Sequence, residues 1–308
     1  MNKRIASFSA ALILLAGCES GGDGATQQPE PVDPVCDSTS VLEGGECLPF
    51  AERIDARATT PFTENGEPVE LEVVLFKPLE GERFPLLVVN HGSTGNGSAP
   101  SRFGETFVHK PTTRHFVEQG WMVAYPQRRG RGRSDGLYDE GFTPNRSGYS
   151  CEAAIALAGA ERALDDIDAV TDWLRLRADV DTTRMLISGA SRGGILSIAY
   201  LARRPEVYLG AINFAGGWSS EGCGDFATIN KTLFVDGAAF PGRSLWIYAE
   251  NDSFYSLGHS QQNFDAFTQA GGVGDFEVFR RDPGLNGHFI INDADRWRVI
   301  VDAYIAGL

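Results

Sequence analysis

Gly189, Ser191 and Gly193 form a G-x-S-x-G pattern within the segment LISGASRGGIL. A serine hydroxyl held on a tight turn can act as the nucleophile of an acyl transfer if a base removes its proton. Glycines two residues before and after the serine remove the side chains that would clash in such a turn. A plain glycine-rich connection can contain the same pattern, so the structural context decides between the two interpretations.

The context favours a nucleophile. Residues 184–188, RMLIS, are a short apolar run typical of a buried strand, and ILSIAYLAR, residues 195–203, begins a helix. GASRGG therefore forms the turn between a strand and a helix. We expect Ser191 to lie on this turn with its hydroxyl available for chemistry.

The elements around this turn alternate between strands and helices. Predicted strands are residues 69–76, 84–90, 121–125, 184–188, 209–214, 245–249 and 276–279, and predicted helices are residues 152–177, 195–203, 257–270 and 293–305. This alternation predicts an α/β fold with a mostly parallel central sheet of about eight strands and helices on both faces. The earliest strands, before Pro78, are expected to pair as an antiparallel hairpin at one edge.

Four short segments occur in a characteristic order, namely NHGSTG, GASRGG, AENDSF and NGHF. Together they resemble the α/β-hydrolase superfamily, most closely its dienelactone-hydrolase-like and prolyl-oligopeptidase-like branches. The resemblance extends from Val69 to the C-terminus and implies the α/β-hydrolase fold, a serine nucleophile, and an acid and a histidine that follow it in the chain. It implies no cofactor and no metal. The nucleophile of dienelactone hydrolase itself is a cysteine, so Ser191 argues against the lactone chemistry of that enzyme.

His288 is the predicted base. It lies in a glycine-rich loop after the last predicted strand, from which its side chain can reach over the edge of the sheet. His259, the other histidine after Ser191, lies at the start of a predicted helix and is expected on the surface. His288 therefore suits proton transfer better than His259 does.

Asp252 is the predicted acid that orients the histidine. The segment SLWIYAENDSFY ends a predicted strand just before Glu250, Asn251 and Asp252, and the superfamily places its acid just past this strand. Glu250 is the fallback, and Asp282 is a weaker candidate because it shares a loop with His288.

The resemblance also implies two backbone donors for an oxyanion, the amides of Ser93 and Arg192. Ser93 follows the predicted strand that ends at Asn90, and Arg192 follows the nucleophile. A phosphate-binding loop is the competing interpretation of the nearby glycines, but Ser98 occupies the position of the required lysine. His91 is expected to shape this loop.

Two further segments could shape the pocket. Arg129, Gly130, Gly132, Ser134 and Gly136 match an R-G-x-G-x-S-x-G loop common in these branches, within which Arg131 or Arg133 could meet an anionic substrate group. Residues 218–240 are expected as a cap element. Its aromatic side chains, Phe226, Phe234 and Phe240, could form an acyl wall or pack in the core. Further pocket candidates, by position alone, are Tyr125, Trp218 and Phe254.

The pattern of residues at the N-terminus predicts an export signal. Lys3 and Arg4 precede an apolar run that is too short to span a membrane comfortably and ends in LAGC, residues 15–18. This ending resembles the lipobox of bacterial lipoproteins, which predicts a signal peptide over residues 1–17 and a lipid anchor on Cys18. An ordinary secretory signal cleaved nearby is the alternative.

The remaining chain divides into three parts. Residues 18–35 have the composition of a flexible tether, residues 36–68 form a small N-terminal extension, and residues 69–308 form the catalytic domain. We expect a protein of the bacterial cell envelope, held by its lipid at the outer membrane or the periplasmic face.

Four cysteines remain besides Cys18, an even number suited to an oxidising compartment. Proximity favours a disulfide between Cys36 and Cys47, which leaves Cys151 to pair with Cys223, although this second pair could also be free buried thiols. No C-x-x-C spacing indicates a metal or redox site.

The net charge and the predicted triad limit the classes of function that the protein could have. The formal net charge of -14 argues against nucleic acid as a partner, and a small-molecule ester is the expected substrate of a Ser191-His288-Asp252 triad. A peptidase or amidase using the same site is the first alternative, and a non-catalytic binding protein on the same fold is the second.

Overall fold

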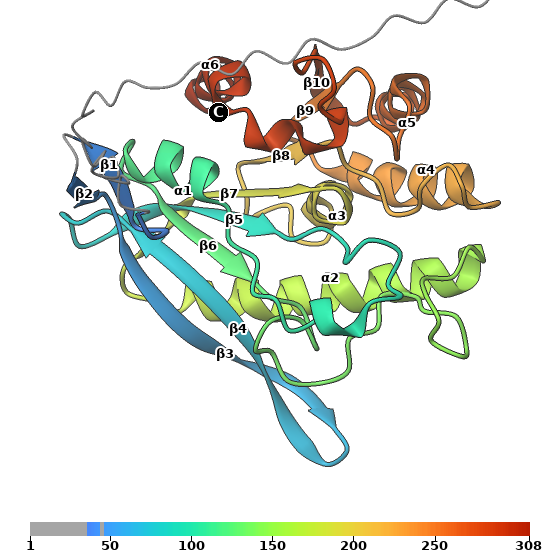
Figure 1. Ribbon diagram of the computed structural model, residues 1–308, viewed down its shortest axis with the longest axis horizontal. Helices are drawn as coiled ribbons and strands as arrows, with labels where there is room; N and C mark the ends of the chain where they lie inside the picture. Colours follow the sequence, from blue (N-terminus) through green and yellow to red (C-terminus); the bar gives the residue numbers. More distant parts are fainter. Residues whose placement is uncertain (1–35, 44–45) are drawn as a thin grey trace, which may run out of the picture.

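The structure, a computed structural model, describes residues 36–43 and 46–308. The expected signal peptide, the tether and Cys18 lie outside these residues. Ten strands lie within the described residues, and the last eight form one sheet in the order β10-β9-β8-β7-β5-β6-β4-β3 (Figure 1). The strands are β1 (Ser40–Glu43), β2 (Glu46–Pro49), β3 (Glu52–Glu64), β4 (Glu67–Lys77), β5 (Phe84–Asn90), β6 (Met122–Pro126), β7 (Val180–Ala190), β8 (Gly210–Phe214), β9 (Arg243–Ala249) and β10 (Val273–Phe279).

The sheet is parallel from β10 to β6, and β4 and β3 continue it in antiparallel pairing. The predicted fold class and the predicted hairpin at one edge are therefore confirmed. Residues 52–64, expected within the N-terminal extension, instead form the edge strand β3. Its alternation is obscured by charged residues and by Pro61, which edge strands tolerate because one side makes no ladder bonds.

In the part of the chain that the structure describes, six α-helices cover the sheet. They are α1 (Lys110–Val117), α2 (Ala153–Arg175), α3 (Arg192–Leu201), α4 (Phe226–Asp236), α5 (Leu257–Gln269) and α6 (Ala294–Ala306). Helices α1 and α6 contact each other on one face, and α2, α3, α4 and α5 contact one another in turn on the other. Helix α1 was not predicted because its sequence KPTTRHFV is short and half of the residues it buries are threonines, Thr112 and Thr113.

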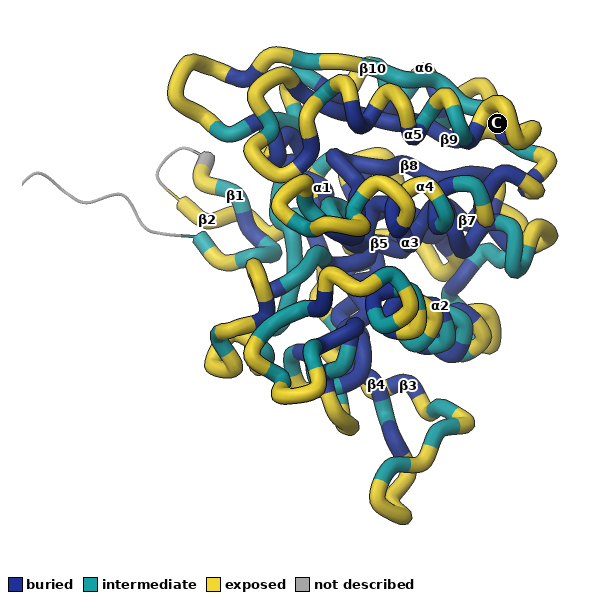
Figure 2. Tube along the Cα trace, turned by 90° about the vertical axis from the view of Figure 1, so that its right-hand side faces the viewer, coloured by how far each residue is buried: buried dark blue, intermediate teal, exposed yellow. Residues whose placement is uncertain are grey.

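The core lies along the central strands, which are dark in Figure 2, whereas the tip of the β3–β4 hairpin is exposed. Strand β8 is buried at every position, and the run Leu86–Asn90 of β5 is buried throughout, as expected for strands covered on both faces. The carboxyl ends of the parallel strands thus meet at one edge of the buried sheet, and the candidate site lies at this edge.

The hairpin of β1 and β2 forms a separate two-stranded sheet, and the predicted disulfide between Cys36 and Cys47 closes it. The second predicted disulfide, between Cys151 and Cys223, is also present. Across the part of the chain that the structure describes, no helix combines the length and apolar character that crossing a lipid bilayer requires.

Candidate active site

Ser191 lies at the junction of β7 and α3 with a backbone φ of 56° and ψ of −125°. Residues other than glycine rarely adopt this region. A Cβ atom on Gly193 would lie 2.0 Å from the carbonyl oxygen of Asn90, and one on Gly189 would lie 2.4 Å from the carbonyl carbon of Gly193. The close approach of strand and helix therefore requires both glycines of the pattern.

Ser191 and His288 line the same cavity, which has a volume of about 730 Å³. The cavity lies where the loops after the six parallel strands β5, β6, β7, β8, β9 and β10 converge. It also contains Ser93 and Arg192, the two expected oxyanion donors. The cavity thus brings together residues that lie far apart in the sequence and were predicted to take part in the same reaction.

Asp252 lies beside His288. The Nδ1 nitrogen of His288 is 2.9 Å from Oδ2 of Asp252, and the side chain of Asp252 is only 1% exposed. The other carboxylate oxygen accepts hydrogen bonds from the amides of Phe254, at 2.7 Å, and Tyr255, at 3.1 Å. With its carboxylate held in this way, Asp252 fixes the orientation of the imidazole ring.

The loops that carry the acid and the histidine are tied to each other. Oδ1 of Asn286 accepts hydrogen bonds from the amides of Ser253, at 3.1 Å, and His288, at 3.0 Å. A Cβ atom on Gly287 would lie 2.3 Å from the carbonyl oxygen of Glu250, so only glycine permits this approach. Sequence reasoning did not single out Asn286 or Gly287.

The two alternative acids point elsewhere. The Glu250 side chain is 50% exposed and pairs with Arg280, and the Asp282 side chain is 74% exposed and pairs with Arg296. Neither makes a hydrogen bond to His288 among the bonds of the described residues.

The structure corrects the expectation that His259 lies on the surface. This residue is 7% exposed, and its Nε2 accepts hydrogen bonds from the side-chain amides of Asn230 and Asn263, each at 2.9 Å. Burial lowers the pKa of His259, in agreement with a neutral ring. It does not line the cavity with Ser191.

The loop after β5 presents Ser93, and His91 supports this loop as expected. The ring of His91 is buried, with Nδ1 2.8 Å from the carbonyl oxygen of Gly92 and Nε2 accepting from the amide of Arg128 at 3.2 Å. Burial lowers the pKa of His91 well below its ordinary value, assisted by the positive charges of Arg128 and Arg131. His91 is therefore a neutral structural residue.

The side chain of Arg192 is a feature that the sequence did not reveal. Its guanidinium lies 3.6 Å from the ring centre of Tyr149 and 4.2 Å from that of Trp218. It also faces the buried carboxylate of Glu140 at 3.3 Å. Burial alone would raise the pKa of Glu140, but Arg128 and Arg192 outweigh it and lower this pKa.

Arg131 differs from the other arginines of its loop. Arg128, Arg129 and Arg133 each pair with a carboxylate, at 2.6, 2.5 and 2.8 Å respectively. Arg131 is 5% exposed, makes no ion pair with any described residue, and lines the cavity. Its Nε donates a hydrogen bond to the carbonyl oxygen of Phe103 at 3.2 Å, and its guanidinium lies 5.3 Å from the ring centre of Tyr138. One amino group, Nη1, is buried without a hydrogen-bond partner, and the positive charge of Arg131 helps to lower the pKa of Glu140.

The aromatic candidates divide between cavity and core. Trp218 and Phe254 line the cavity. The ring of Phe226 packs on that of His259, and the ring of Phe234 packs on that of Trp246. Phe240 is buried in the core. Tyr125 is fully buried, and its hydroxyl donates a hydrogen bond to the carbonyl oxygen of His109. These four are not lining residues. The expected cap segment therefore divides: residues 218–223 contribute to the cavity wall, and residues 226–236 form helix α4, which packs into the fold.

No group of three or more His, Cys, Asp or Glu side chains is arranged to hold a metal ion within residues 36–43 and 46–308. The groups available at the cavity are instead a hydroxyl, an imidazole and backbone amides. Such a set is suited to nucleophilic acyl transfer.

Comparison with known proteins agrees with this fold. The model of the family described as X-Pro dipeptidyl-peptidase (S15 family) matches residues 65–228, a range that contains Ser191 but not Asp252 or His288. No curated protein matches the chain.

Solved structures with the same fold include hydrolases of several kinds. An acylaminoacyl peptidase from Pyrococcus horikoshii is 16% identical with a TM-score of 0.58, and the match covers 83% of this chain and 42% of that one. An esterase from Pyrococcus furiosus is 15% identical with a TM-score of 0.57, covering 83% and 90%. A protein from Klebsiella pneumoniae assigned as a dienelactone hydrolase is 19% identical with a TM-score of 0.53, covering 83% and 100%.

Proposed function

We propose that this chain, which belongs to the S15 family, described as X-Pro dipeptidyl-peptidase, and to the α/β-hydrolase superfamily, is an exported serine hydrolase. We propose further that the bonds it cleaves are carboxylic esters. Ser191 is the nucleophile, His288 the base and Asp252 the acid. One arrangement carries the proposal. Ser191 lies on a strained turn and lines the same cavity as His288, whose ring is hydrogen-bonded to the buried carboxylate of Asp252.

The reaction proceeds in two acyl transfers. Nε2 of His288 takes the proton of the Ser191 hydroxyl while its oxygen attacks the ester carbonyl, and Asp252 stabilises the imidazolium. The amides of Ser93 and Arg192 donate hydrogen bonds to the oxyanion. His288 then protonates the leaving alcohol, and a water molecule repeats these steps on the acyl-enzyme.

The charges of the cavity favour an ester over an N-terminal peptide as substrate. A dipeptidyl-peptidase must bind the ammonium group of a peptide's N-terminus, and a carboxylate is the natural partner for that charge. Among the lining residues that the structure describes, the one carboxylate side chain is Glu105, which is 63% exposed and lies 3.8 Å from Arg102. Peptidase or amidase activity at the same site remains the alternative function.

Arg131 supports a substrate with a negatively charged group. A buried guanidinium without a carboxylate partner is unfavourable unless an anion approaches it. Arg131 lies in the wall of the cavity and is the arginine of its loop that lacks such a partner within the described chain. We therefore extend the proposed substrate class to esters that carry a carboxylate.

Export and anchoring are also part of the proposal. Two disulfides suit an extracellular or periplasmic location, and the LAGC segment supports a lipid on Cys18. The full chain and a Cys18→Ser variant should be compared for incorporation of radiolabelled palmitate and for sedimentation with membranes. A Cys18→Ser variant found wholly in membranes would contradict the anchor.

Hydrolysis of p-nitrophenyl acetate and butyrate tests the enzyme class. The full chain should turn over both esters, and Ser191→Ala should not. An aminoacyl p-nitroanilide tests the peptidase alternative, which faster turnover of the anilide would favour. If the folded chain cleaves none of these substrates and a fluorophosphonate does not label it, the non-catalytic alternative is correct.

A further inference from the structure

We propose that the side chain of Arg192 positions the backbone amide of the same residue for oxyanion binding, and that the Cys151–Cys223 disulfide keeps this side chain in place. The inference rests on the proposed function, because the oxyanion forms only if Ser191 is a nucleophile. In this role Arg192 acts through its own backbone, and the disulfide acts through Arg192.

The guanidinium of Arg192 is held from every side. It lies between the rings of Tyr149 and Trp218, with distances of 3.6 and 4.2 Å to the ring centres. Nε donates to the carbonyl oxygen of Trp218 at 3.0 Å, and an amino group donates to the carbonyl oxygen of Glu140 at 3.0 Å. A cation between two rings gains most when water is excluded, and Arg192 is 4% exposed.

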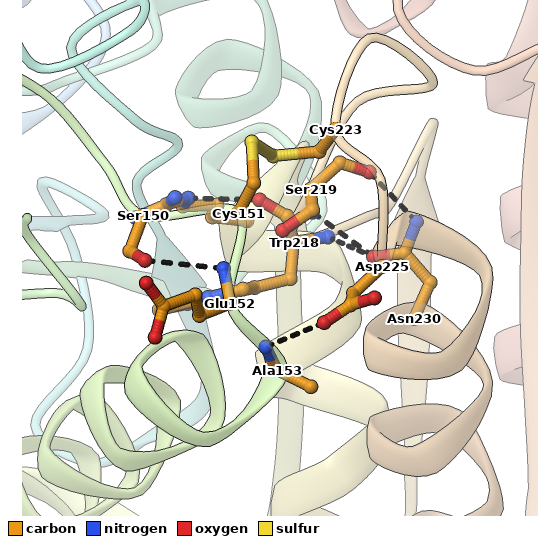
Figure 3. Close-up of a disulfide and its surroundings, with 10 residues drawn as sticks. Ser150, Cys151, Glu152, Ala153, Trp218, Ser219, Cys223, Asp225 and Asn230 are labelled. Carbon is orange, nitrogen blue, oxygen red and sulfur yellow. Dashed lines mark hydrogen bonds between the residues drawn. A yellow bond between two sulfur atoms is a disulfide. The ribbon is translucent and has the colours of Figure 1, made fainter.

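The two rings belong to different loops. Tyr149 precedes α2, and Trp218 follows β8. Cys151 lies two residues after Tyr149, Cys223 lies five residues after Trp218, and their disulfide joins the two loops at the wall of the cavity (Figure 3). The gap that the guanidinium fills is therefore bounded by a covalent link.

Figure 3 also shows the hydrogen bonds around this link. The side-chain oxygen of Asn230 accepts from the amides of Trp218, at 2.8 Å, and Ser219, at 3.0 Å. One hydrogen bond crosses between the loops, from the amide of Ala153 to Asp225 at 3.0 Å. Asn230 thus holds the loop of Trp218 on α4, while the disulfide sets its distance from the loop of Tyr149.

The backbone at Arg192 needs such support. Arg192 is the first residue of α3, so its amide has no carbonyl oxygen within the helix to bind and is free to point into the cavity. The preceding residue, Ser191, has a strained backbone, and strain persists only where surrounding contacts determine the conformation. A side chain fixed at its far end restricts rotation of the peptide group that carries the donor.

A comparison of two disulfide deletions tests this inference. The double variant Cys151→Ser/Cys223→Ser should lower kcat for p-nitrophenyl acetate about tenfold with little change in KM, because misdirecting an oxyanion donor weakens transition-state binding more than substrate binding. The double variant Cys36→Ser/Cys47→Ser removes a disulfide outside the cavity and should keep wild-type kcat. Both are measured well below their thermal unfolding transitions.

Arg192→Lys supplies the second arm. It keeps the charge beside Glu140 but removes the planar group between the rings, and kcat should fall to a similar extent. Combining Arg192→Lys with the Cys151/Cys223 variant should cause no further fall, since both changes disturb the same element. Additive losses, or an unchanged kcat in the folded Cys151/Cys223 variant, would overturn the inference.

Hydrogen exchange gives a readout that does not depend on turnover. Amides of the segment that begins α3 should exchange faster in the Cys151/Cys223 variant and in Arg192→Lys than in wild type, and at the wild-type rate in the Cys36/Cys47 variant. If the wild type cleaves no ester, the proposed function fails. Equal exchange in all four proteins would overturn the inference even if the wild type is active.

Discussion

The Nδ1 nitrogen of His288 lies 2.9 Å from Oδ2 of Asp252, and the other oxygen of this carboxylate accepts hydrogen bonds from two backbone amides. A carboxylate oxygen accepts hydrogen bonds but does not donate them, so the nitrogen that faces it must be the donor. This contact fixes the imidazole with Nδ1 protonated and leaves Nε2 free to accept a proton. The proposed mechanism depends on this arrangement.

Asp252→Asn should lower kcat for p-nitrophenyl esters on the order of a thousandfold or more, because an amide group facing Nδ1 favours the wrong tautomer of His288. Steady-state kinetics on the purified variant measure the effect. Glu250→Gln is the matched control, since that exposed carboxylate pairs with Arg280, and it should keep nearly full activity. Equal losses in the two variants would contradict the assignment of the acid.

The variants His259→Gln and His288→Gln should have opposite effects on ester turnover. His288→Gln should abolish turnover, whereas His259→Gln should retain it, because His259 lies outside the cavity. A glutamine oxygen can still accept hydrogen bonds from Asn230 or Asn263. Loss of activity in a folded His259→Gln variant would contradict the choice of base.

The same His259→Gln variant should change the dependence of stability on pH. Burial lowers the pKa of His259 below its ordinary value of 6.5, so the unfolded chain binds more protons than the folded chain at pH values just under 6.5. The free energy of unfolding therefore falls as the pH drops below 6.5, by at most about 1.4 kcal/mol per pH unit from this residue. Urea unfolding between pH 5 and 8 should show a smaller slope in His259→Gln than in wild type.

Arg131→Gln should alter the choice of substrate more than the rate of the reaction. For the methyl half-ester of glutaric acid, kcat/KM should fall on the order of tenfold or more, since a hydrogen-bonded charge pair is lost. For the uncharged analogue, in which an amide replaces the free carboxylate, kcat/KM should stay close to wild type. Arg133→Gln is the control because that side chain is 61% exposed and pairs with Glu72.

The two disulfides should contribute unequally to stability. Cysteines 151 and 223 are 72 residues apart, and cysteines 36 and 47 are 11 apart, so the first pair restricts the unfolded chain more. By the chain-entropy relation, replacing the Cys151–Cys223 pair by serines should lower the free energy of unfolding by about 1.7 kcal/mol more than replacing the other pair. Urea unfolding of the two double variants tests this difference.

The sequence was most informative where chemistry coincides with the end of a strand. Parallel strands carry their following loops to one edge of the sheet, so the strands that precede Ser191, Asp252 and His288 predicted that these three residues would lie near one another. The disulfide pairing followed from the proximity of Cys36 and Cys47. Strand β3 was harder to predict because an edge strand buries few residues and its charges mask the alternation.

The sequence was least informative where residues far apart in the chain meet. Arg192 meets Glu140, 52 positions earlier, and Trp218, 26 positions later, and no spacing rule connects them. For Phe234 and Phe240, a position between two strands fitted a pocket wall and the core equally well, and packing against the sheet decided for the core. His259 was misjudged because a helix start is usually exposed, whereas here Asn230 and Asn263 accommodate a buried ring.

The backbone conformation at position 191 suits glycine better than serine, so the residue that would be most stable there is not the proposed nucleophile. Glycine adopts a φ of 56° with a ψ of −125° at little cost, whereas serine and alanine do not. Ser191→Gly should therefore raise the free energy of unfolding by about 1 kcal/mol, while Ser191→Ala, equally inactive, should leave it nearly unchanged. The hydroxyl that the proposed reaction requires is therefore held at a cost in stability.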